Sequence, residues 1–141
     1  MNNLTFDQQS VKLKLDKILA SIEILKQVAE FSEEDFLKDR IIQLASERSL
    51  QIATQSIIDI STHLIAHNHW GTPNSYKDSV EIITRKGVID RTLGTNLVNL
   101  VKLRNVIIHI YMDIDPKTIF ESVQRAISDL YDFIEAIRKL T

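Results

Sequence analysis

An arginine, an imidazole and a phenol interrupt one of the most apolar stretches of the chain. They stand in segment 104–111, which reads RNVIIHIY, where folding alone requires only apolar side chains. A guanidinium placed there needs a carboxylate, a set of carbonyls, or a cleft that admits water and an anionic ligand, because burying it alone is costly. The planar fork of Arg104 could bind two oxygens of a phosphate, and the imidazole of His109 could transfer protons near neutral pH.

The residues around Arg104 have the spacing of an amphipathic helix. One stripe recurs at steps of three and four residues: Leu93, Leu97, Leu100, Arg104, Ile107 and Tyr111. Further apolar residues occupy the other sides, so we expect a helix from about Asp90 to Asp113 that is covered all round and lies centrally. We expect one of its sides to face a second subunit. This arrangement predicts a two-fold dimer with Arg104 and His109 near the interface.

The same spacing predicts four further helices, and only three glycines and two prolines are available for turns. These helices are expected over residues 7–30, 32–67, 75–86 and from Pro116 onward. The second would be about 35 residues long, which is unusual, so we expect a kink or break in it. The sequence therefore predicts an all-α fold. It would be a single domain over residues 1–141, an antiparallel bundle of about five helices that dimerises through the helix bearing segment 104–111.

Charge and composition exclude several classes of protein. The formal net charge is −2 and the pI is about 6.1, so the chain has no overall positive field for nucleic acid. Binding to RNA or DNA would need a local basic patch. The candidates for such a patch are Arg40, Arg48, Arg85, Lys86 and Arg91. There is no cysteine, which excludes disulfides and thiolate metal sites.

Nothing in the sequence suggests export or a membrane. The first residues lack the basic end and apolar run of a signal peptide, and no stretch approaches the roughly 18 apolar residues of a membrane span. We therefore expect a cytoplasmic protein without a membrane partner.

Three histidines near the end of the second predicted helix form the one other group with possible ligand chemistry. His63 and His67 are four residues apart, which would suit a transition metal, and His69 follows. No acidic residue or cysteine stands nearby, so we favour polar or dipole-stabilising roles and expect no metal. Trp70 could stack on a base, but as the sole tryptophan it is expected to pack against the end of the bundle.

The motif in segment 104–111 resembles the signature of the HEPN superfamily, and more closely its HepT-like branch: arginine, four residues, histidine, any residue, tyrosine. Other segments look like parts of that branch as well. They are Glu47-Arg48, Ile57-Ile58-Asp59-Ile60, Gly71-Thr72-Pro73 with Ser75-Tyr76-Lys77-Asp78, and Asp113-Ile114-Asp115. The resemblance covers roughly residues 10 to 138.

This resemblance implies a metal-independent endoribonuclease toxin of a type VII-like toxin–antitoxin pair, acting on single-stranded RNA or tRNA without a cofactor. Its partner would be a minimal nucleotidyltransferase antitoxin that silences it by attaching AMP to Tyr111. Arg104, His109 and Asn105 would be catalytic. The chemistry is reasonable: His109 can move protons between the 2'-hydroxyl and the leaving 5'-oxygen, Arg104 can stabilise charge on phosphorus, and Asn105 can bind phosphate or orient the imidazole. A phosphodiester on Tyr111 would compete for the guanidinium.

Two questions stay open at this point. On a straight helix, at about 100° per residue, Arg104 and His109 lie about 140° apart. Either the helix is distorted or the site combines residues from two subunits, and we favour the composite site. Without the resemblance, Arg104 would be read as a buried ion-pair partner of Glu47, Asp59 or Asp113. The alternative function is a non-catalytic helical binding module that serves a nucleotidyltransferase.

Overall fold

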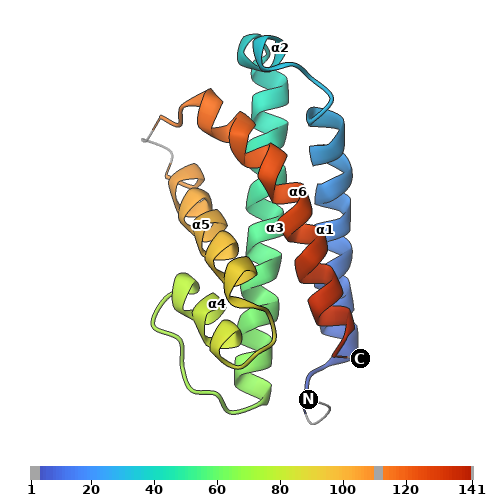
Figure 1. The fold of residues 1–141 in the computed structure, drawn as a ribbon, viewed down its shortest axis with the longest axis vertical. Coiled ribbons are helices and arrows are strands. Elements are labelled where there is room, and N and C mark those ends of the chain that lie inside the picture. The colour runs from blue at the N-terminus through green and yellow to red at the C-terminus, as the bar shows by residue number, and fades with distance from the viewer. Residues whose placement is uncertain (1–3, 110–112, 141) are drawn as a thin grey trace.

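The computed structural model describes residues 4–109 and 113–140, and every regular element in them is a helix (Figure 1). The helices are α1 (Gln8–Val28), α2 (Glu33–Lys38), α3 (Arg40–His67), α4 (Tyr76–Arg85), α5 (Arg91–Ile107) and α6 (Pro116–Arg138). The expected all-α bundle is confirmed, with six helices in these residues instead of about five. None of the helices in the described ranges is both long enough and apolar enough to cross a bilayer.

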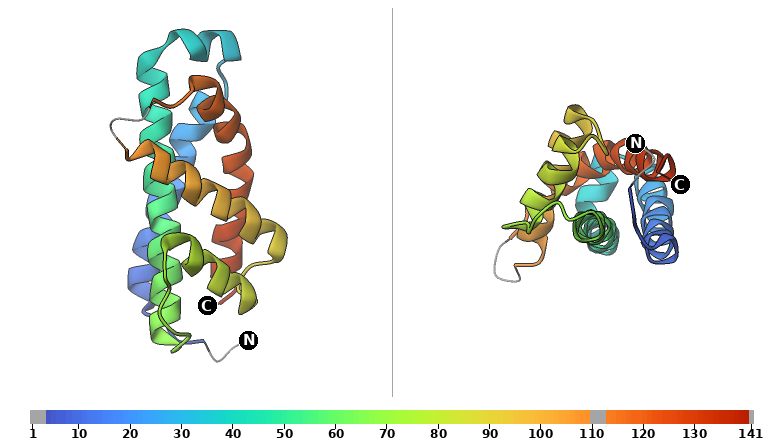
Figure 2. Two further views of the ribbon diagram at one scale, coloured as in Figure 1. Left: turned by 90° about the vertical axis from the view of Figure 1, so that its left-hand side faces the viewer. Right: turned by 90° about the horizontal axis from the view of Figure 1, so that it is seen from below.

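The long helix α3 is the centre of the bundle. It packs against each of the other five helices, while α5 packs mainly against α3, α4 and α6 within the described chain. Figure 1 shows α1 running beside α3, α6 crossing the pair, and α4 and α5 on the other side; Figure 2 shows the same grouping from two further directions. The expectation that the motif-bearing helix lies centrally is therefore wrong. At 28 residues, α3 alone is long enough to touch every neighbour.

The second predicted helix breaks at Asp39. This residue has an extended backbone, with φ −120° and ψ 101°, and its carboxylate accepts the backbone N–H groups of Ile41 and Ile42 at 3.0 and 3.2 Å. It thus ends α2 and caps α3. The carbonyl of Phe36 accepts the backbone N–H of Asp39 at 3.2 Å and the side-chain amide of Gln43 at 3.0 Å, which fixes the end of α2 against α3. The expected break in the long helix is confirmed, and its cause is an N-cap.

Helix α5 ends earlier than its sequence pattern suggested. The last helical residue is Ile107, and Ile108 and His109 form a closing turn in which their N–H groups donate to the carbonyls of Arg104 and Val106. The expectation of a helix to Asp113 is wrong. Ile108 is 41% exposed, so no core contact holds it to a further helical turn. The chain must also reverse direction before Pro116, the first residue of α6.

Helices α4 and α5 form a tight antiparallel pair. Gly87 has a positive φ of 79° and sits in the turn that follows α4, as its place in the sequence predicts. Gly94 lies where the two helices cross, and a Cβ atom there would clash with the side chain of Thr84. Because the two helices approach closely, their solvent-facing side chains lie next to each other along one side of the bundle.

Candidate phosphate-binding site at the end of α5

Arg104 lies half-buried in the last turn of α5, where side chains from three helices meet it. Its Nη2 donates to Oε1 of Gln55, on α3, at 2.5 Å, and its Nη1 donates to Oδ1 of Asn105 at 3.1 Å. The guanidinium carbon is 5.0 Å from the centre of the Tyr76 ring at the start of α4, within the range of a cation–π contact. The planar cation is therefore held in a fixed orientation.

No carboxylate in the described residues neutralises Arg104. Among the partners that the sequence offers, Glu47 instead bonds Arg40 at 3.3 Å and Asp59 bonds Lys14 at 2.9 Å. The Nε of Arg104 is enclosed and has no hydrogen-bond partner in the described part of the chain. The guanidinium carries more N–H donors than its two hydrogen bonds use, so it retains a full charge and free donors for an anion.

The side chain of Gln55 is itself held in place by the carboxylate of Asp59. Its Nε2 donates to Oδ1 of Asp59 at 2.9 Å, which directs its carbonyl oxygen toward Arg104. Asp59 and Lys14 are each about one-third exposed, so their ion pair contributes little to stability, and its effect is to fix the amide of Gln55. Sequence analysis missed the contacts of Gln55 and Tyr76 with Arg104. The only signal was that Gln55 stands four residues before Asp59, on the same side of a helix.

His109 stands outside the helix that carries Arg104. It is exposed, and its backbone N–H closes the turn after α5 at 3.2 Å from the carbonyl of Val106. The angular separation of about 140° expected for Arg104 and His109 on a straight helix therefore does not apply, because α5 ends at Ile107. Asp113 is exposed and makes no ion pair with Arg104 in the described structure. Tyr111 lies outside the described residues.

An open hollow of about 490 Å³ adjoins this end of α5. It is lined by Asn105, Tyr76, Lys77, Thr62 and the loop 73–75. Two of the side chains that contact the Arg104 guanidinium thus also line a space that solvent and a ligand can reach. Of the three environments that the sequence allowed for the guanidinium, the structure shows carbonyl oxygens, from Gln55 and Asn105, beside an open hollow.

The other histidines serve the structure. Nε2 of His63 accepts the backbone N–H of Asp7 at 2.9 Å, and its ring stacks on that of His67 with centroids 3.9 Å apart. Burial lowers the pKa of His63, and the nearby His67 lowers it further, so the neutral ring is favoured and its lone pair is already occupied. No cluster of three metal-ligating side chains occurs in residues 4–109 and 113–140. Trp70 packs against the core, with the Lys86 ammonium 5.8 Å from its ring, as expected.

The fold and site define an all-α domain with a half-buried arginine in the last turn of one helix and an exposed histidine just beyond that helix. Residues 18–137 match the family described as Ribonuclease HepT-like, and the chain belongs to this family. It is 28% identical to an mRNA nuclease HepT of Shewanella oneidensis over 129 residues, which is 89% of this chain and 93% of the relative. It is 26% identical to a tRNA nuclease HepT of Aphanizomenon flos-aquae over 127 residues, 90% of this chain and 86% of that one.

Solved structures show the same fold. A crystal structure of a toxin–antitoxin with AMP-PNP superposes with a TM-score of 0.86 and 26% identity, over 93% of this chain and 98% of that one. A tri-AMPylated HEPN toxin of Shewanella oneidensis in complex with an MNT antitoxin gives a TM-score of 0.85 and 27% identity, over 99% of both chains.

Proposed function

We propose that this protein is a metal-independent endoribonuclease, the toxin of a toxin–antitoxin pair, and that the whole chain forms one HEPN-like domain. The observation that carries the proposal is the state of Arg104. Its guanidinium is held by Gln55, Asn105 and Tyr76, has no carboxylate partner in the described structure, and lies beside an open hollow. An enclosed cation of this kind suits a phosphodiester. The nuclease names of the relatives support the same activity.

In this mechanism Arg104 binds the scissile phosphate and stabilises the charge that develops on its oxygens. His109 removes the proton of the 2'-hydroxyl, whose oxygen then attacks phosphorus, and a protonated imidazole supplies the proton for the departing 5'-oxygen. The products are a 2',3'-cyclic phosphate and a 5'-hydroxyl. Asn105 holds Nη1 of Arg104 through its side-chain oxygen and orients the guanidinium toward the substrate.

We further propose that two copies associate through the end of α5, so that a site combines Arg104 and His109 of different subunits. The support is that the described chain does not fully bury the apolar side chains at the end of α5. Leu103, Val106 and Ile107 are only half-buried, and Ile108 is 41% exposed. Apolar side chains in these positions lose water when a second copy packs on them. The placement of His109 beyond the helix also leaves it accessible to a neighbouring subunit.

The direct test is RNA cleavage in the presence of a chelator. Purified protein with excess EDTA is incubated with end-labelled single-stranded RNA and with tRNA, and the fragments are tested for a 2',3'-cyclic phosphate. We expect cleavage that EDTA does not reduce. The 5' fragments should lose their terminal phosphate to a 3'-phosphatase only after acid has opened the cyclic phosphate. Cleavage that stops in EDTA would contradict metal independence. Complete inertness toward both RNAs would favour the binding module that serves a nucleotidyltransferase.

We also propose that a minimal nucleotidyltransferase attaches AMP to Tyr111 and thereby silences the nuclease. The support is a similar structure, that of a tri-AMPylated HEPN toxin in complex with an MNT antitoxin. Mixing this protein with ATP and a minimal nucleotidyltransferase antitoxin is expected to add one or more AMP groups to the intact mass. Tyr111→Phe should show no addition, because the acceptor oxygen is missing, and Tyr131→Phe serves as the control, since that phenol is 38% exposed on α6. AMP found on another residue would overturn this assignment.

A further inference from the structure

A second hollow, of about 380 Å³, lies between the outer surfaces of α4 and α5, and its charge is strongly one-sided. Four basic side chains line it: Lys77 and Arg85 from α4, and Arg91 and Lys102 from α5. Glu81 is its one acidic lining residue among those described. We call this feature the α4–α5 groove. It concentrates positive charge on a chain whose net charge is −2.

The four cations of the α4–α5 groove are not used to hold the fold. All four are exposed, and within the described residues none has a hydrogen bond, ion pair or ring contact. The other basic residues proposed from the sequence are engaged: Arg40 bonds Glu47, Arg48 donates to Gln51, and Lys86 lies over Trp70. Arg91 also begins α5, where a positive charge opposes the helix dipole.

The α4–α5 groove leads into the Arg104 site. Lys77 lines both this groove and the hollow beside Asn105, so the two spaces adjoin. Along α5, the groove-facing stripe runs Arg91, Thr95, Val98, Lys102 and Asn105, at steps of four and three residues. At 1.5 Å per residue it is about 21 Å long, enough for several nucleotides of an extended strand.

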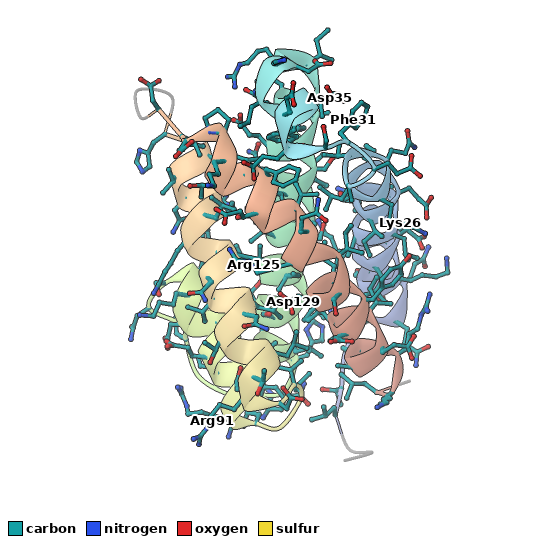
Figure 3. The ribbon with its side chains drawn as sticks, turned by 45° about the horizontal axis from the view of Figure 1, so that its top comes forward. Lys26, Phe31, Asp35, Arg91, Arg125 and Asp129 are labelled. Atoms are coloured by element: carbon teal, nitrogen blue, oxygen red, sulfur yellow. The ribbon has the colours of Figure 1, made fainter. Side chains whose placement is uncertain are left out.

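Near its start, the side of α5 that faces α6 has the opposite charge. A hollow of about 770 Å³ between α5 and α6 is lined by Asp90, Asp129, Asp132 and Glu135, with Lys139 as the one cation among its described lining residues. Figure 3 shows Asp129 on α6 and Arg91 at the far end of α5, at the edge of the bundle. A polyanion that approaches the start of α5 is therefore attracted on the α4 side and repelled on the α6 side.

We propose that the α4–α5 groove binds the sugar–phosphate backbone of single-stranded RNA and guides it to Arg104 and His109. This inference rests on the proposed ribonuclease function and adds where the substrate lies outside the reacting bond. Exposed lysine and arginine side chains contact phosphates without reading the base, so the groove contributes affinity for any sequence. The cleavage specificity would then come from the hollow beside Asn105.

The test measures binding and cleavage separately. In a His109→Ala background, the anisotropy of a fluorescent single-stranded RNA is compared for Arg85→Gln/Arg91→Gln and for Lys17→Gln/Lys26→Gln. The control pair removes the same charge from exposed positions on α1 (Figure 3 labels Lys26). We expect the groove variant to bind roughly two- to thirty-fold more weakly, as for two exposed ion pairs. Its plot of log affinity against log salt should be shallower by about 1.4. The control should match the parent.

The cleavage arm uses the same substitutions with His109 intact. The groove variant should cleave the long RNA more slowly, with most of the change in KM, and should cleave a dinucleotide as fast as the parent, because the dinucleotide does not reach the groove. Equal RNA affinity and salt dependence in groove and control variants would overturn the groove proposal, even if the parent cleaves RNA. If the groove variant binds RNA as tightly as the parent but binds the antitoxin protein more weakly, the groove is a binding site for that partner. This result would also overturn the RNA proposal. If the parent binds RNA through the groove but cleaves nothing, the ribonuclease function fails and the groove stands.

Discussion

His109→Ala is expected to lower the rate of RNA cleavage by roughly 10²- to 10⁴-fold, the usual contribution of general acid–base catalysis. The fold should survive, because His109 is exposed and follows the last helical residue of α5. Single-turnover cleavage of end-labelled RNA in EDTA measures the effect on the chemical step, and thermal unfolding checks the fold. Binding of RNA, measured by anisotropy, should change little.

The matched control is His69→Asn. His69 is an exposed imidazole at the far end of α3 with a positive φ of 56°, a conformation that asparagine tolerates. Its rate should equal that of the parent. If His109→Ala cleaves at the parent rate, the general acid–base role belongs to another group and the proposed mechanism is wrong.

Arg104→Lys is expected to lower kcat by roughly 10²- to 10³-fold, as when one preorganised donor to a developing oxyanion is removed. Lysine keeps the charge but loses the planar fork, and it cannot both hold Gln55 and offer paired donors to a phosphate. The loss should appear mainly in kcat. Steady-state cleavage of a short RNA gives kcat and KM, and circular dichroism gives the melting temperature.

Arg48→Lys is the control for this change. Arg48 also lies on the bundle surface and donates to a glutamine, at 3.3 Å from Gln51, but it lines none of the described hollows beside the motif. Its kcat should be unchanged. If Arg104→Lys and Arg48→Lys behave alike, the guanidinium of Arg104 has no special role in the transition state, and its half-buried position would be structural only.

Sequence periodicity predicted the helices and most of their ends well but failed at the end of α5. The repeat of apolar residues continues from Leu93 to Tyr111, yet α5 stops at Ile107. Periodicity registers which side chains are apolar, and it does not register whether anything covers them. The break at Asp39 could be anticipated from helix length, but the capping hydrogen bonds to Ile41 and Ile42 that cause it depend on local backbone geometry.

The candidate site could also be predicted only in part from the sequence. Arg104, Asn105 and His109 could be chosen from their types and spacing, because chemistry depends on functional groups that the sequence states directly. The side chains that hold Arg104 come from positions 49 and 28 residues earlier, Gln55 and Tyr76. No pattern in the sequence around the motif indicates that either residue contacts Arg104. Their roles arise from the packing of α3 and α4 against α5.

The sequence by itself determined the helical class, the family and the reactive groups, since each of these is written in short-range spacing and residue type. Only the tertiary structure decided which charges remain unpaired. Long-range packing assigns a partner to Glu47 and Asp59 and leaves Arg104, Arg85 and Arg91 without a carboxylate in the described residues. The net charge of −2 hides this separation, because an electrostatic field depends on where charges lie in space and not on their sum.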